Sequence, residues 1–166
     1  MAQSFNCNHL HIVFSTKGRA NTISEPQRMW SYLGGIATNV SATPLAIGGT
    51  KNHVHLLVTL PADLSVSKFL NTLKSNSSKW MSERGKTFAW QRGYASFSVS
   101  ASNLAAVTKY IETQEEHHKK WSFEQEFLSL LKKHNVRFDA EHVSIRVSPA
   151  KAGFDYFFAA DLGLTA

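Results

Sequence analysis

The sequence has almost no cysteine, since Cys7 is the only one among 166 residues. A single cysteine excludes an intrachain disulfide and a zinc knuckle built on thiolates. No apolar run approaches the roughly 18 residues that a membrane-spanning helix needs. The first fifteen residues, MAQSFNCNHLHIVFS, lack the basic start and long apolar core of a signal peptide. These absences predict a soluble, cytoplasmic protein with no membrane-spanning segment.

Glycine-rich phosphate loops, internal repeats and low-complexity segments are also missing. Their absence excludes P-loop nucleotide hydrolases and repeat architectures. The composition, with 43% hydrophobic and 18% charged residues, is typical of a chain that buries a core of its own. We therefore expect one folded domain over residues 1–135, followed by a C-terminal tail over 136–166 that carries no motif of its own.

Acidic residues are fewer than basic ones, with 12 Asp and Glu against 18 Lys and Arg. The formal net charge is +6 and the isoelectric point is about 9.6, before any of the 8 histidines is protonated. Such an excess predicts a polyanionic partner, with nucleic acid the first candidate and a membrane surface the second. Many basic proteins bind no nucleic acid, so the charge alone leaves the question open.

Apolar periodicity predicts the order β-α-β-β-α-β followed by further helices. The predicted strands are 9–15, 44–50, 53–60 and part of 88–99, and the predicted helices are 24–40, 65–84, 103–119 and 122–134. The lysines of the second helix are expected in solvent, namely Lys68, Lys74 and Lys79. This order is typical of the α+β, ferredoxin-like split βαβ fold, in which the first and third strands lie centrally in an antiparallel sheet and both helices cover one face.

The third predicted strand carries His53-Val54-His55. Residues two apart in a strand point to the same side, so both imidazoles share a face while Val54 takes the other. Two such rings can hold a divalent metal. A single pair of this spacing also occurs as ordinary, partly exposed strand histidines, and His9-Leu10-His11 is a second copy. The spacing therefore leaves both interpretations open.

Tyr110 and Gln114 are four residues apart in the third predicted helix and so share one of its faces. The amide oxygen is a suitable ligand for Mg²⁺ or Mn²⁺, and a phenol can act as a nucleophile. The same two side chains also serve packing and solvation in many helices. Combined with a metal on a basic protein, they predict in-line attack on a phosphodiester and a phosphotyrosine product.

Five stretches occur in one order along the chain: HIVFSTKGR at 11–19, KNHVHLLV at 51–58, SVSKFLNTLKSNSSKW at 65–80, WQRGY at 90–94 and YIETQ at 110–114. Together they resemble the single-tyrosine HUH transposases, the transposase A proteins of the smallest bacterial insertion sequences, which are related to repeat-associated tyrosine transposases. The likeness covers about residues 8–134, and five ordered stretches are far more specific than the His-apolar-His pair alone.

The resemblance implies that His53, His55 and Gln114 hold a divalent ion, Mg²⁺ or Mn²⁺, and that Tyr110 is the catalytic nucleophile. It implies cleavage and rejoining of single-stranded DNA beside hairpins, through a 5′-phosphotyrosine and without ATP. It further implies a homodimer in which the tyrosine helix can be exchanged between subunits, with residues 98–102 as a hinge. A mobile element and a domesticated, repeat-associated role both fit the residues.

Basic side chains near these motifs are the predicted phosphate contacts: Lys17, Arg19, Lys51, Arg92 and Lys109. Each of them also fits a plain solvated surface. His9 and His11, on the neighbouring strand, are expected to support the metal ligands or to pack beside them. Two other functions stay open: a metal-dependent hydrolase with a water nucleophile, which would not need Tyr110, and a non-catalytic nucleic-acid-binding module, which would need neither the tyrosine nor the histidines.

Overall fold

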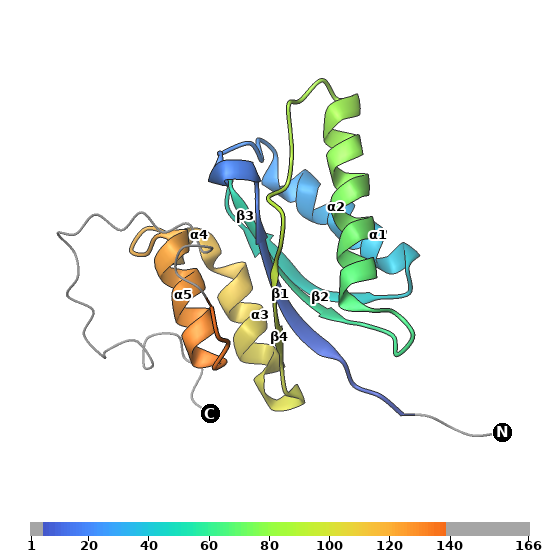
Figure 1. Ribbon diagram of the computed structural model, residues 1–166, viewed down its shortest axis with the longest axis vertical. Coiled ribbons are helices and arrows are strands. Elements are labelled where there is room, and N and C mark those ends of the chain that lie inside the picture. The colour runs from blue at the N-terminus through green and yellow to red at the C-terminus, as the bar shows by residue number, and fades with distance from the viewer. Residues whose placement is uncertain (1–4, 139–166) are drawn as a thin grey trace. The chain divides into compact units, whose positions relative to one another are not determined.

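The computed structural model describes residues 5–138, and these residues include a four-stranded antiparallel sheet (Figure 1). In chain order its elements are β1 (His9–Ser15), α1 (Pro26–Asn39), β2 (Thr43–Gly49), β3 (His53–Thr59), α2 (Val66–Glu83) and β4 (Ala95–Ser98). The spatial order β2-β3-β1-β4 places the first and third strands in the middle. The predicted ferredoxin-like split βαβ fold is therefore confirmed.

The chain divides into two compact units, Met1–Glu115 and Glu116–Ala166. The first holds the sheet, α1, α2 and the helix α3 (Leu104–Glu112); the boundary falls within the short helix α4 (Gln114–His117), and α5 (Phe123–Lys133) belongs to the second. None of the described helices combines the length and the apolarity that crossing a membrane would require. The domain division expected after residue 135 stays a prediction, because almost all of the tail lies outside the described residues.

The two faces of the sheet have different side chains. One face packs against α1 and α2 and supplies the strand residues of the apolar core: Ile12, Phe14, Val54, Leu56 and Val58. The helix α3 lies on the opposite side of the sheet, as Figure 1 shows. Because strand residues alternate, that second face presents His11, His53 and His55. The sheet thus separates the apolar core from a polar, histidine-bearing face.

All four predicted helices begin within two residues of the predicted places. Ser65 caps α2, since its hydroxyl accepts from the backbone N–H of Lys68 at 3.3 Å, and Ser122 with Gln125 forms a reciprocal capping box at the start of α5. The N-cap position of α1 is Glu25, whose side chain makes no capping hydrogen bond. Pro26 follows it in the first turn, where the absence of an N–H costs nothing.

The third predicted helix, 103–119, is shorter in the structure and is interrupted. The helix α3 ends at Glu112, and Gln114 begins the separate helix α4. The hydroxyl of Thr113 donates to the carbonyl oxygen of Lys109 at 2.9 Å, an acceptor that the Thr113 N–H also uses at 3.1 Å. Such back-bonding by a threonine often bends a helix, and Thr113 itself leaves the helical conformation, with φ −100° and ψ 19°. Tyr110 and Gln114 therefore lie on consecutive helices rather than on one.

Candidate metal and tyrosine site

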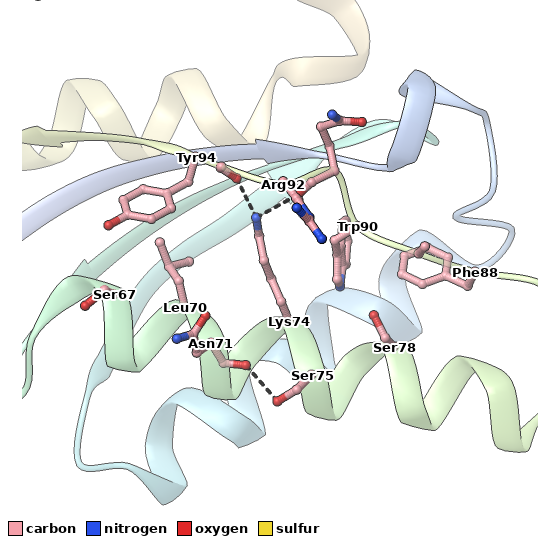
Figure 2. A pocket seen from close by; sticks show the side chains of 13 residues that line it. Ser67, Leu70, Asn71, Lys74, Ser75, Ser78, Phe88, Trp90, Arg92 and Tyr94 are labelled. Atoms are coloured by element: carbon pink, nitrogen blue, oxygen red, sulfur yellow. Dashed lines mark hydrogen bonds between the residues drawn. The ribbon is translucent and has the colours of Figure 1, made fainter.

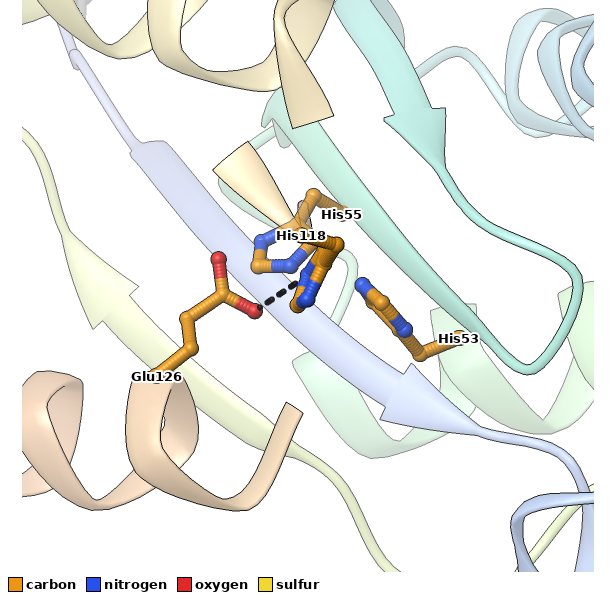
Figure 3. Close-up of side chains that lie close together, drawn as sticks. All are labelled: His53, His55, His118 and Glu126. Carbon is orange, nitrogen blue, oxygen red and sulfur yellow. Dashed lines mark ion pairs between the residues drawn. The ribbon is translucent and has the colours of Figure 1, made fainter. Parts of the chain in front are cut away.

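His53 and His55 project from the same side of β3, and both are fully buried (Figure 3). The antiparallel register places His53 opposite Ser15 and His55 opposite Val13 on β1. Their ring centroids are 5.2 Å apart and the rings are nearly perpendicular. Buried imidazoles require hydrogen-bond partners or a metal for their nitrogens. The interpretation of His53 and His55 as partly exposed strand histidines is therefore wrong.

The turn before β3 determines which nitrogen of His53 carries the proton. Its Nδ1 lies 2.7 Å from the amide oxygen of Asn52 and 3.1 Å from the hydroxyl oxygen of Thr50. The Thr50 hydroxyl donates to that same amide oxygen at 3.1 Å, so the Asn52 oxygen acts as an acceptor. The Nδ1–H of His53 donates to it, and the lone pair of the neutral ring is on Nε2.

Gln114 brings an oxygen to that lone pair. Its Oε1 lies 3.4 Å from His53 Nε2, while its Nε2 lies 3.5 Å from the carbonyl oxygen of Tyr110. Two acceptors facing each other at this distance repel unless a cation lies between them. Two ligand atoms that are each about 2.1 Å from one ion are about 3.0 to 3.4 Å from each other. The pair of atoms on His53 and Gln114 thus fits a divalent ion.

Tyr110 lies on α3 beside the two strand histidines. Its ring meets His55 edge-on, with the centroids 5.7 Å apart, and meets His11 edge-on at 6.0 Å. Only 7% of the residue is exposed. The structure therefore brings together, within the first unit, the tyrosine, both histidines and the glutamine that the sequence singled out.

A glycine on β2 permits the close approach of α3 to the sheet. A Cβ built on Gly48 would overlap the carbonyl oxygen of Ile111 and would lie 3.0 Å from its Cγ2 atom. Ile111 directly follows Tyr110, so the contact fixes the turn of α3 that carries the phenol. A residue with any side chain at position 48 would push this turn away from the strand.

Four of the five predicted basic contacts lie on segments that meet at one end of the sheet. Backbone hydrogen bonds join Lys17 to Ala89 at 2.8 Å, and Gln91 to Ser15 at 2.8 Å. The N–H of Thr16 donates to the carbonyl of Asn52 at 2.9 Å, which brings in the turn before His53. The four residues on these segments are Lys17, Arg19, Lys51 and Arg92. The fifth, Lys109, is exposed on α3 next to Tyr110.

A cavity of about 510 Å³ lies between α2 and residues 88–94 (Figure 2). Lys74, which the sequence placed in solvent, extends from α2 and donates to the carbonyl oxygens of Gln91 and Gly93. Burial lowers the pKa of Lys74 to about 8, so the amine is still mostly charged at neutral pH. It holds in place the segment that carries Arg92 and Tyr94, and Tyr94 is 44% exposed.

The second unit has a buried carboxylate of its own. Glu126 on α5 lies 3.1 Å from Nε2 of His118, the ion pair dashed in Figure 3, and 3.5 Å from Nε2 of His117. Burial lowers the pKa of His118, but the hydrogen bond and the charge of Glu126, with the carbonyl of Trp121, outweigh it and raise the pKa above its usual value. Side chains suited to a metal ion therefore occur in both units.

Sequence reasoning missed the residues that support the site. Asn52 and Thr50 had a signal, since they are the polar residues of the turn directly before His53. No pattern in the sequence indicated the role of Lys74, because its burial depends on residues 88–94 folding over α2. Glu126 and His118 lay in regions assigned only as helices.

Comparison with known proteins supports one family. The model of a family described as "Transposase IS200 like" matches residues 4–114. The transposase for insertion sequence element IS200 from Salmonella typhimurium is 31% identical over 126 residues, which cover 69% of this chain and 81% of that protein. The IS200 transposase from Salmonella typhi gives the same figures.

Two solved structures share the fold. A candidate transposase from Deinococcus radiodurans has a TM-score of 0.55 at 22% identity, covering 69% of this chain and 95% of that one. A REP-associated tyrosine transposase bound to a REP hairpin has a TM-score of 0.56 at 14% identity, and the match covers 71% of this chain and 74% of that one. With the family model spanning most of the chain and a relative above 30% identity, the chain belongs to the IS200-like transposase family.

Proposed function

We propose that this transposase cleaves and rejoins single-stranded DNA by metal-assisted tyrosine transesterification at hairpin-flanked element ends, with Tyr110 as the nucleophile. The observation that carries the proposal is the convergence of its groups within one unit. The Tyr110 ring lies 5.7 Å from that of His55, and the nitrogen of His53 lies 3.4 Å from the oxygen of Gln114. A nucleophile beside a set of metal ligands is the arrangement that phosphodiester cleavage requires.

His53, His55 and Gln114 are the proposed ligands of a divalent ion, Mg²⁺ or Mn²⁺. When bound, such an ion neutralises charge that develops on the phosphodiester oxygens. Asn52 keeps His53 in the tautomer that can bind the ion, since it accepts the Nδ1 proton. The backbone carbonyl of Tyr110 orients the amide of Gln114 in the same way.

The hydroxyl oxygen of Tyr110 attacks the phosphorus in line, and the bond from phosphorus to the 3′ oxygen breaks. The phenol loses its proton and the leaving 3′ oxygen gains one, so the products are a 5′-phosphotyrosine and a 3′-hydroxyl. A 3′-hydroxyl from another cut end then attacks the phosphotyrosine, which joins the strands and restores the phenol. Each ester bond is exchanged for another, and therefore no ATP is required.

A phenol that is only 7% exposed has to become accessible before DNA can reach it. Exchange of the tyrosine helix between the subunits of a homodimer would provide such a movement. Between Ser98 at the end of β4 and the start of α3, the chain forms only a short 3₁₀ turn over Ala101–Asn103. This connection is the proposed hinge.

Single-stranded DNA with hairpins, in the cytoplasm, is the proposed substrate. A solved relative with the same fold is bound to a REP hairpin. In this chain Lys17, Arg19, Lys51 and Arg92 lie on segments joined at the end of the sheet where β3 begins with His53, and Lys109 neighbours the nucleophile. A DNA backbone along these charges would bring a phosphodiester to the metal ligands.

Arg92→Gln is expected to weaken binding of single-stranded DNA several-fold and to lower the slope of log affinity against log salt by about 0.7, the share of one phosphate contact. Lys79→Gln is the matched control, because the Lys79 side chain is 76% exposed and pairs with Glu83 on α2. Fluorescence anisotropy at several salt concentrations measures both slopes. A slope unchanged in Arg92→Gln would remove Arg92 from the DNA path.

Gly48→Ala is expected to lower the free energy of unfolding by about 1 to 3 kcal/mol, because the new methyl group collides with the backbone of α3. The displaced Tyr110 should form the covalent product on the order of 10²-fold more slowly. Gly35→Ala on α1 is the control, since its methyl group would meet no atom within 4 Å. Urea unfolding and single-turnover cleavage separate the two effects; equal cleavage rates in the two variants would show that Gly48 does not position the tyrosine.

The proposed chemistry is tested with single-stranded DNA from the flanks of the gene, labelled at either end and incubated with the protein and Mg²⁺ or Mn²⁺. In a denaturing gel the 3′-labelled fragment should migrate with the protein, while the 5′-labelled fragment is released with a 3′-hydroxyl. Release of both labelled fragments without a covalent adduct would favour a hydrolase. Binding without cleavage would favour a non-catalytic module.

A further inference from the structure

His11 is a third histidine on the face of the sheet that bears His53 and His55. It lies on β1 and is only 3% exposed. The register places His11 opposite Leu57 and Val13 opposite His55, so the imidazoles of His11 and His55 lie diagonally across the strand pair. Side chains in this relation are within reach of each other when they are long or aromatic.

The two rings are joined by a hydrogen bond. His11 Nε2 lies 2.8 Å from His55 Nδ1, and the rings are stacked with their centroids 5.1 Å apart. One of these nitrogens donates and the other accepts. If His11 donates, the proton of a neutral His55 is on Nε2, and that ring has no lone pair to offer a metal. If His55 donates, its Nε2 carries the lone pair.

We propose that His11 is a positioning residue that accepts the Nδ1–H of His55 and so holds His55 in the tautomer that binds the ion through Nε2. The inference rests on the proposed function, because it assigns His11 to the same metal. Asn52 has the equivalent role toward His53 across a 2.7 Å hydrogen bond. Metal-binding histidines generally donate their second N–H to a neighbouring acceptor. His11 carries its own proton on Nδ1.

His11 also contacts the nucleophile. Its ring meets Tyr110 edge-on, with a centroid distance of 6.0 Å, and it meets Phe97 at 6.2 Å. A single imidazole therefore contacts both a proposed metal ligand and the phenol. Loss of His11 should slow formation of the adduct more than it weakens binding of DNA.

The test is a titration of the full chain with Mn²⁺ alone, followed by electron paramagnetic resonance and without DNA. His11→Phe keeps a ring but has no acceptor, and we expect its Mn²⁺ affinity to fall by about 10- to 100-fold. His11→Gln places an amide oxygen near the position of Nε2 and should recover most of the affinity. His9→Phe is the matched control: His9 lies on the same strand but hydrogen-bonds the Thr59 hydroxyl at 2.7 Å, and its loss should leave the affinity unchanged.

Unchanged Mn²⁺ affinity in both His11 variants, beside a wild-type protein that binds Mn²⁺, would overturn the inference and leave the proposed function intact. Equal losses in His11→Phe and His11→Gln would overturn it as well, because they would indicate packing alone. A wild-type protein that binds no Mn²⁺ would contradict the proposed metal site itself. Thermal melts check the fold, and if His11→Phe does not fold, His11→Asn takes its place, since its shorter amide cannot reach His55.

Discussion

Tyr110→Phe is expected to abolish the covalent DNA adduct and to reduce strand cleavage at least about 10⁴-fold, because the variant lacks only the attacking oxygen. The ring that meets His55 and His11 is retained. The free energy of unfolding should therefore fall by no more than about 1.5 kcal/mol, the net contribution of one hydrogen bond. DNA affinity should be nearly unchanged. Cleavage kinetics, anisotropy and urea unfolding measure the three quantities.

Tyr94→Phe is the matched control for that experiment. Tyr94 is 44% exposed and lies beside the α2 cavity rather than beside the strand histidines. Its variant should form the adduct at the wild-type rate. Cleavage that persists in Tyr110→Phe would contradict the proposed chemistry and would leave a water nucleophile as the explanation. Loss of the adduct in both variants would point to a defect in DNA binding.

Removal of a metal ligand is expected to have the second large effect. His53→Ala should lower Mn²⁺ affinity by at least about 10²-fold, because it removes the nitrogen that faces Gln114. Adduct formation should be lost with it, and chelation by EDTA should have the same effect on the wild-type protein. Calorimetric titration with Mn²⁺ and the gel assay measure both quantities.

Two further variants make the metal test specific. Gln114→Glu keeps an oxygen near His53 and should still bind Mn²⁺, whereas Gln114→Leu, of similar size, should not. His134→Ala at the end of α5 is the control, since the His134 ring hydrogen-bonds the backbone carbonyl of Leu130. Wild-type Mn²⁺ affinity in His53→Ala would exclude this residue as a ligand and would contradict the site as proposed.

The sheet could be predicted from the sequence because its signals are local. Alternation along residues 53–59 separates Val54 and Leu56 from the two histidines, and the structure shows this division between the two faces of β3. Apolar periodicity predicted the helices 65–84 and 122–134, and the structure caps them with Ser65 and Ser122 through hydrogen bonds that span three residues. Signals of such short range depend little on the rest of the chain.

The features that could not be predicted depend on competition or on distant contacts. The interruption after α3 falls at Thr113, whose φ of −100° and ψ of 19° depart from a helix, and apolar periodicity does not reveal it. Lys74 is buried because the chain returns at residues 91–93 to supply two carbonyl oxygens. The bond from His11 to His55 joins residues 44 positions apart and depends on the pairing of β1 with β3.

The candidate site itself was found by combining spacing with the resemblance to a family. The His-apolar-His spacing indicated a shared strand face, and the family resemblance linked it to a tyrosine and a glutamine more than fifty residues later in the sequence. The structure adds two features that neither the spacing nor the family resemblance contains. The hydrogen bond from His53 Nδ1 to the amide oxygen of Asn52 determines the tautomer of His53. The absence of a side chain at Gly48 allows α3 to approach β2 closely.

Mapping the covalent adduct by mass spectrometry tests the central claim most directly. The protein is incubated with single-stranded flanking DNA and Mn²⁺, then digested with nuclease and trypsin, and the peptides are searched for a nucleotide joined through phosphate. The chain has 4 tyrosines, so the site of attachment is informative. We expect the modification on Tyr110, within the peptide 110–119. A nucleotide on Tyr32, Tyr94 or Tyr156, or cleaved DNA without any modified peptide, would contradict the account.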